Sequence, residues 1–207
     1  IDIAGKVRAI KFVRIDGREY IAVVAGNEVT FWNAATGKQN EAHKFETPVQ
    51  DDSVRILSLA VSQNKNLLAV GSEDGTITLW DMKTKEMKFH ACSYGELENN
   101  NDAICKARGD GAVEIRSVAF NTEGTLLASG SSDSHVWLWD PQSGELLTRS
   151  VGSSEGGHIN SVVGLAFDPQ TGNLASGSWD NTVRIWNPET DENGDWRLEL
   201  VDVLSGH

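Results

Sequence analysis

Three residue types of a hydrolytic triad occur close together near the end of the sequence, at His158, Ser176 and Asp180. A serine that a histidine activates and an aspartate orients is the machinery of serine hydrolases. That machinery needs an exposed serine beside an oxyanion hole, whereas Ser176 stands within an apolar run that reads as a strand. Degraded copies of the same pattern also recur elsewhere in the chain. We therefore expect these three residues to be structural and the chain to be non-enzymatic.

A phosphate-binding loop is a second chemistry to consider, because Thr36-Gly37-Lys38 matches the end of such a motif. The motif requires a glycine five positions before Gly37 and a serine or threonine after Lys38. Those places hold Trp32 and Gln39. The sequence therefore does not predict nucleotide binding here.

Metal ligation is a third chemistry, with His90, Cys92 and Cys105 as the available donors. No second Cys-x-x-Cys pair accompanies them, and such a pair is the usual mark of a structural zinc site. The acidic residues along 189–202 are interpreted as a solvated face. We expect no metal and no cofactor. Two cysteines are also too few for a disulfide scaffold, which favours free thiols and leaves a single bridge open.

Charge and composition narrow the class of partner. The chain of 207 residues has 18 Lys and Arg against 30 Asp and Glu, a formal net charge of −12. Such a charge repels phosphate backbones, and no basic cluster offsets it, so we expect no direct nucleic-acid partner. No apolar stretch is long enough to span a membrane. The sequence shows no features of a secreted protein, so we expect the chain to be cytoplasmic.

Four tryptophans mark an internal repeat. Trp32, Trp80, Trp139 and Trp186 each follow an apolar residue that ends an earlier run, by 20 residues in the first unit and by 19 in the other three. The gaps between each tryptophan and the next unit vary, and residues 90–112 carry the largest insertion. A constant inner part with a variable outer connection predicts three tightly packed strands followed by a tolerant edge.

Each unit is rich in short β segments. Apolar runs such as Val118-Ala119-Phe120 alternate with Gly, Asn and Asp turns, and no sustained helical periodicity occurs. In 136–139 both faces of the third run are apolar, so this strand is expected to be buried on two sides. Fourth strands are predicted at 43–47, 86–91, 145–151 and 196–203.

This plan resembles the WD-repeat β-propeller family over essentially the whole chain. The fourth unit carries the family signature in order: Gly157-His158, then Leu165-Ala166-Phe167, then 175–180, then Arg184-Ile185-Trp186-Asn187. The resemblance implies an all-β propeller with four four-stranded antiparallel blades, at about 2–50, 51–107, 108–155 and 156–205, within one domain of 1–207. Gly206-His207 would begin a fifth unit. The blades are thus expected to belong to a larger ring of seven or eight, since open ends would expose apolar faces.

The resemblance also assigns a buried hydrogen-bond chain of Asp, His, Ser and Trp to each blade. The fourth unit supplies all four as Asp180, His158, Ser176 (Ser178 if the register shifts) and Trp186. The third keeps Asp133, Ser129 and Trp139 but has Gly111 at the histidine position. The second keeps Asp74 and Trp80, with Val70 and Asp52 at the other two places. The first keeps only Trp32, with Gly26 and Ala22 where the Asp and Ser would be.

Propellers of this family mostly bind proteins or peptides at the rim of the central channel. By resemblance the residue before each turn aspartate points onto that surface, which gives Glu73, Ser132 and Trp179. Trp179 is the leading candidate because an indole in a turn has no strand packing to justify it; covering a neighbouring blade is the alternative. Asn160 and Ser161 are secondary candidates. Glu73, with the net charge, favours a basic partner surface, and 90–112 is either a partner-specific or a mobile loop.

The function predicted from these features is a protein-interaction scaffold. Its partners would be a protein or peptide ligand, together with the remaining blades of the same parent chain or a second copy of this chain. The alternative is a WD-repeat sensor region of a larger signalling NTPase or effector protein.

Overall fold

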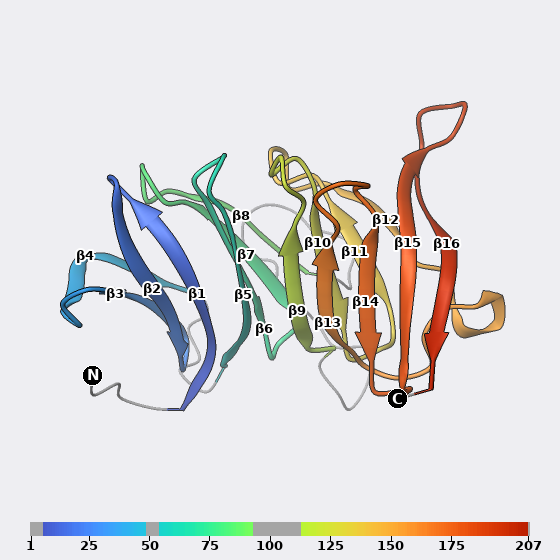
Figure 1. Ribbon diagram of the computed structural model, residues 1–207, viewed down its shortest axis with the longest axis horizontal. Helices are drawn as coiled ribbons and strands as arrows, with labels where there is room; N and C mark the ends of the chain where they lie inside the picture. The colour runs from blue at the N-terminus through green and yellow to red at the C-terminus, as the bar shows by residue number, and fades with distance from the viewer. Residues whose placement is uncertain (1–5, 49–53, 93–112, 207) are drawn as a thin grey trace.

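The computed structural model describes residues 6–48, 54–92 and 113–206. Within these ranges sixteen strands form four antiparallel sheets, each with four strands in sequence order, and a single short 3₁₀ turn, η1 (Ser153–Glu155), is the only helical element. The predicted fold class is therefore confirmed. Figure 1 shows the sheets side by side as the blades of an open arc, with blade 1 at one end and blade 4 at the other.

The strands of each blade follow one another along the chain. Blade 1 contains β1 (Val7–Ile15), β2 (Arg18–Ala25), β3 (Glu28–Asn33) and β4 (Gln39–Glu46). Blade 2 contains β5 (Ile56–Ser62), β6 (Leu67–Ser72), β7 (Thr76–Asp81) and β8 (Met87–Cys92). Blade 3 contains β9 (Ile115–Phe120), β10 (Leu127–Ser131), β11 (Val136–Trp139) and β12 (Leu146–Arg149). Blade 4 contains β13 (Val162–Phe167), β14 (Leu174–Ser178), β15 (Thr182–Thr190) and β16 (Trp196–Ser205).

The residues in and beside the turns determine where the hairpins form. Asp16 and Gly17 join β1 to β2 with φ of +48° and +76°, the left-handed geometry that a two-residue hairpin turn requires. In the first three blades the residue after the signature tryptophan ends the third strand by accepting backbone hydrogen bonds. The Oδ1 atom of Asp81, for example, accepts from the amides of Lys83 and Thr84 at 2.7 and 3.0 Å.

Blade 4 departs from this plan at Asn187. Its third strand does not turn there but continues to Thr190, and β16 pairs with it as far as Trp196. The Asn187 amide donates to Glu189 at 2.9 Å rather than organising a turn. The result is the longest hairpin of the described residues, which extends beyond its blade at the upper right of Figure 1.

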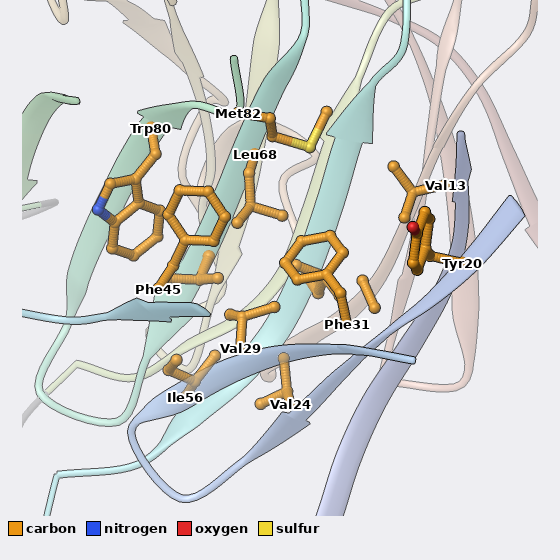
Figure 2. Close-up of a cluster of buried hydrophobic side chains, with 13 residues drawn as sticks. Val13, Tyr20, Val24, Val29, Phe31, Phe45, Ile56, Leu68, Trp80 and Met82 are labelled. Atoms are coloured by element: carbon orange, nitrogen blue, oxygen red, sulfur yellow. The ribbon is translucent and has the colours of Figure 1, made fainter. Parts of the chain in front are cut away.

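The core lies between blades. Figure 2 shows the cluster that joins blades 1 and 2, where Phe31, Phe45 and Trp80 pack in sequence. The ring centroids are 5.8 Å apart for Phe31 and Phe45 and 5.7 Å apart for Phe45 and Trp80. The first pair is edge-on and the second tilted, and such contacts stabilise the core in addition to the burial of aromatic surface. Similar clusters join blade 2 to blade 3 and blade 3 to blade 4, so each blade is stabilised by its neighbours.

Two sequence expectations concern the connection after β8. Cys92 lies in β8 and is disulfide-bonded, so the prediction of a free thiol is wrong at this residue. Residues 93–112, which include Cys105 and most of the predicted loop, lie outside the described residues. Among the described residues no helix has the length and apolar character needed to cross a membrane.

Candidate functional site

The triad-like residues of blade 4 form a buried chain of hydrogen bonds. His158 Nδ1 lies 2.8 Å from Asp180 Oδ2, and His158 Nε2 lies 2.8 Å from Ser176 Oγ. The indole Nε1 of Trp186 donates to the same Ser176 oxygen at 2.7 Å. For these four residues, the neutral tautomer with its proton on Nδ1 fits the contacts: Trp186 donates to Ser176, Ser176 to Nε2, and Nδ1–H to Asp180. Ser176 rather than Ser178 therefore occupies the serine position.

Arg184 joins this chain, although the sequence reasoning did not single it out. Its Nη1 lies 2.9 Å from Asp180 Oδ2, and its Nε donates to the Gly156 carbonyl at 2.7 Å. Only 8% of Arg184 is exposed, so the charge is buried but paired. The signal was present in the strand alternation, because Arg184 stands two residues before Trp186 and so shares its face.

These contacts shift the protonation equilibria of the cluster. Burial is the largest influence and lowers the pKa of His158; the hydrogen bond to Asp180 opposes it, and the Arg184 charge lowers the pKa further. Burial raises the pKa of Asp180, but hydrogen bonds from Thr182 and His158 outweigh that and hold the pKa well below its ordinary value. The cluster therefore rests with a neutral imidazole between a carboxylate and a guanidinium.

The geometry leaves Ser176 without the features of a nucleophile. Its side chain is fully buried, and its oxygen already contacts both His158 and Trp186. A catalytic serine must reach substrate, so this chain of contacts stabilises the blade rather than a reaction.

The other blades keep parts of the arrangement. In blade 3, Trp139 Nε1 donates to Ser129 Oγ at 2.9 Å, while Asp133 contacts Ser131 and His135 rather than Ser129. Gly111 lies outside the described residues. In blade 2, Asp74 accepts from the Thr76 hydroxyl at 2.7 Å, and Trp80 packs on Phe45. The structure thus joins the four predicted partners into one chain in blade 4.

Among the described residues, no three His, Cys, Asp or Glu side chains lie close enough together to hold a metal ion. His90 Nδ1 instead lies 2.8 Å from the Thr78 hydroxyl of the neighbouring strand.

Three of the predicted binding residues, Glu73, Ser132 and Trp179, directly follow β6, β10 and β14. The turns after these strands lie along the lower edge of the arc in Figure 1. The amides of Glu73, Ser132 and Trp179 each donate to a carbonyl 18 residues earlier, at Arg55, Glu114 and Ser161 respectively. We call these three turn residues and their three carbonyl partners the turn row. The row brings Glu73, Ser132 and Trp179 onto one edge of the molecule.

Trp179 is the exposed aromatic of the turn row. Its side chain is 54% exposed, and the guanidinium of Arg116 lies over the ring, 4.5 Å from the centroid. Arg116 is itself paired with Glu114 at 2.5 Å. Ile159, whose amide donates to the Asp180 carboxylate, is 72% exposed close to this turn. An indole and an isoleucine thus face solvent at the same end of blade 4.

Two predicted binding residues are engaged within the chain. Both carboxylate oxygens of Glu73 accept from Arg55, at 2.7 and 2.8 Å, and this contact is the main cause that lowers the pKa of Glu73. Ser161 is only 5% exposed, and its hydroxyl donates to the Ser132 carbonyl at 3.2 Å. Little of the Ser161 side chain is therefore open to a partner, and its role in binding stays a prediction. Asn160 is exposed and its Oδ1 accepts from the Ser161 amide at 2.8 Å.

Comparison with known proteins supports the same fold. The family model described as "Nucleolar protein 10-like, N-terminal domain", a β-propeller, matches residues 1–201. The anaphase-promoting complex subunit cdc20 of Dictyostelium discoideum is 29% identical over 144 residues, covering 58% of this chain and 28% of that protein. The probable cytosolic iron-sulfur protein assembly protein 1 of Candida glabrata is 32% identical over 104 residues, covering 50% and 28%.

A third relative is the WD repeat-containing protein slp1 of Schizosaccharomyces pombe, which is 26% identical over 147 residues, covering 59% of this chain and 29% of that protein. The chain spans less than a third of the length of each of these three relatives. With four signature blades and a family match over nearly its full length, the chain belongs to the Nucleolar protein 10-like N-terminal domains, a family of WD-repeat β-propellers.

Proposed function

We propose that this chain is a non-catalytic scaffold that binds a protein or peptide at the blade 4 end of the turn row, around Trp179. The observation that carries the proposal is Trp179, a half-exposed indole held in place from one side. Exposed tryptophans are enriched among the residues that dominate binding energy at interfaces. The names of two relatives are consistent with a scaffold, since one describes a subunit of a complex and the other an assembly protein.

Arg116 prepares Trp179 for this role. A guanidinium 4.5 Å from the ring centroid restricts the indole without covering its second face. An anchor that is already ordered loses less entropy when a partner binds. Ile159 adds apolar surface close by, so the fitting partner presents an apolar or aromatic side chain to the pair.

The charge of the partner is a finer part of the proposal. The net charge of −12 favours a basic protein by long-range attraction and disfavours direct binding of nucleic acid. Glu73 contributes little to that preference, because a partner lysine or arginine would first have to displace Arg55.

Location and assembly complete the proposal. Cytosolic is part of one relative's name, which supports a cytoplasmic chain, whereas the family's description names a nucleolar protein. Imaging of the tagged full-length protein separates the two compartments. The four blades would form part of a seven- or eight-bladed ring, completed by further blades of a parent chain or by a second copy.

The binding proposal is tested with Trp179→Ala in the full-length protein. Partners are captured with the wild-type protein and identified, and their affinities for both forms are then measured by calorimetry. We expect binding to weaken by more than about 2 kcal/mol and the melting temperature to stay nearly unchanged. Leu146→Ala, at an exposed position of β12, is the matched control and should leave binding intact.

The outcomes separate the two roles of Trp179. A lower melting temperature with unchanged affinity would mean that Trp179 covers a neighbouring turn and that the binding surface lies elsewhere. Unchanged affinity and unchanged stability would also reject the turn row of blade 4 as the interface.

A further inference from the structure

The charge around Trp179 differs from the charge of the whole chain. The chain carries a formal net charge of −12. The acidic side chains that flank Trp179 are nevertheless both paired with arginine, Glu114 with Arg116 and Asp180 with Arg184. The net charge attracts a basic protein from a distance, but the groups in contact decide which side chain the indole accepts. At Trp179 those groups are balanced in charge rather than acidic.

Arg116 reaches Trp179 from the preceding blade. It stands at the bulge of β9 in blade 3, and its guanidinium lies over the indole of blade 4. Arg8 stands at the matching bulge of β1 in blade 1. The pKa of Glu73, the blade 2 counterpart of Trp179, is lowered by its hydrogen bond with Arg55 and more weakly by the charge of Arg8. Blades 3 and 4, which the structure describes, therefore make the site around Trp179.

A second cation is a poor ligand for this indole. The Arg116 guanidinium already lies 4.5 Å from the ring centroid on one face, and a partner lysine or arginine on the other face would be repelled by it. An apolar side chain avoids that repulsion. Ile159, which is 72% exposed, adds apolar surface close to the same turn. The side chain that packs on Trp179 should therefore be apolar.

Arg116 can bind an acceptor that its own chain does not supply. A guanidinium has five N–H donors in a planar fork that suits a carboxylate. The Nη2 atom of Arg116 lies 2.5 Å from Oε2 of Glu114, whereas its Nε atom is buried and has no acceptor among the described residues. A buried donor without an acceptor is costly. The side chain as a whole is 28% exposed, so a carboxylate can approach it from solvent.

We propose that the segment bound at Trp179 carries an aspartate or glutamate next to its apolar anchor, and that Arg116 binds this carboxylate. The anchor packs on the indole and on Ile159, while the carboxylate accepts from the donors that Glu114 leaves free. This inference rests on the proposed function, because it needs Trp179 to be the binding site. It makes Arg116 a residue that selects the partner as well as one that holds the indole.

Three pools of short synthetic peptides test this preference. Every peptide carries a leucine, isoleucine or phenylalanine, and the residues beside it are acidic in one pool, asparagine or glutamine in the second, and basic in the third. Binding to the full-length protein is measured by fluorescence anisotropy in about 0.15 M salt, where charges more than about 8 Å apart are largely screened. We expect the acidic pool to bind at least about tenfold more tightly than the amide pool, and the basic pool no more tightly than the amide pool.

Substitutions at Arg116 assign the preference to its guanidinium. Arg116→Met keeps an unbranched side chain against the indole but removes the charge, so it should abolish the preference for the acidic pool and leave the affinity for the amide pool nearly unchanged. Arg116→Lys keeps the charge without the fork and should keep only part of the preference. Arg14→Met is the matched control, because Arg14 pairs with Glu19 at 3.1 Å outside the turn row. Circular dichroism melts should show all three variants folded.

The outcomes separate this inference from the proposed function. Pools that bind the wild type no more tightly than Trp179→Ala would reject Trp179 as the binding site, and the carboxylate preference with it. Pools that need Trp179 but do not favour the acidic members would overturn the inference alone. A preference for the acidic pool that persists in Arg116→Met would likewise overturn it and leave the binding site in place.

Discussion

Blades 3 and 4 place different side chains at one equivalent position beside the same serine-tryptophan hydrogen bond. Arg184 pairs across the sheet with Ser176, and Trp137 pairs with Ser129 in the same way. In blade 4 the Arg184 guanidinium lies 2.9 Å from Asp180 Oδ2 and 2.5 Å from His158 Nδ1. In blade 3 the indole Nε1 donates to Ser131 Oγ at 3.1 Å, and Arg149 stacks on the ring from outside, 5.6 Å from its centroid.

The difference shows two ways of occupying the strand position that Arg184 holds in blade 4 and Trp137 holds in blade 3. Blade 4 buries a charged cluster whose members satisfy one another, whereas blade 3 uses one large aromatic side chain with one polar atom. A buried ionic cluster is strongly destabilised when one member is removed. An aromatic substitute depends instead on packing. Blade 4 should therefore be the more sensitive to isosteric polar substitutions and to acid.

The largest expected effect comes from the residue type that both blades share. Trp186→Ala should lower the free energy of unfolding by about 3–5 kcal/mol, because Trp186 is fully buried and its truncation leaves a large cavity. Urea denaturation monitored by circular dichroism measures the loss. A loss below about 1 kcal/mol would contradict the burial of Trp186, and the exposed Trp179→Ala serves as the control.

Replacement of aspartate by the neutral, isosteric asparagine should cost different amounts of stability in the two blades. Asp180→Asn should lower the free energy of unfolding by about 2–3 kcal/mol, because it removes the charged acceptor of Thr182, His158 and Arg184. Asp133→Asn, at a side chain 17% exposed and without a buried arginine, should lose less than half as much. Equal losses in the two variants would show that the charge of Asp180 contributes no more to stability than the charge of Asp133.

The smallest effect is a dependence on pH with opposite signs in the two blades. The pKa of His158 is lowered from 6.5 by burial, so its contribution to stability is complete above 6.5 and is lost as the pH falls below it. The hydrogen bond that His135 donates to Asp133 raises the pKa of His135, so the contribution of His135 to stability is present below 6.5 and is lost as the pH rises.

His135→Asn should therefore make the loss of stability between about pH 8 and about pH 5 steeper than in the wild type, by under about 1 kcal/mol. Urea denaturation at a series of pH values measures this slope. A shallower slope in the variant would reverse the sign assigned to His135.

Part of the candidate site followed from the sequence. The run from Gly157 to Asn187 resembles the WD-repeat signature, and that resemblance assigned His158, Ser176, Asp180 and Trp186 to one chain of contacts. The roles of Arg184 and Trp137 did not follow, since alternation gives a face but not the neighbour that meets it. The internal contacts of Glu73 and Ser161 depend on Arg55 and on blade 3, which lie 18 and 29 residues away in sequence.

The sequence by itself determined the blades, because alternating apolar residues and Gly, Asn and Asp turns act over a few residues and need no distant partner. It did not determine which faces of the blades are covered. The segments 127–131 and 174–178 are both Leu-Ala-Ser-Gly-Ser. Gly130 nevertheless lies against Val162 of the next blade, whereas a Cβ atom on Gly177 would meet no atom of the described chain within 4 Å. Only the tertiary structure separates them, because coverage depends on what another blade places against an identical strand.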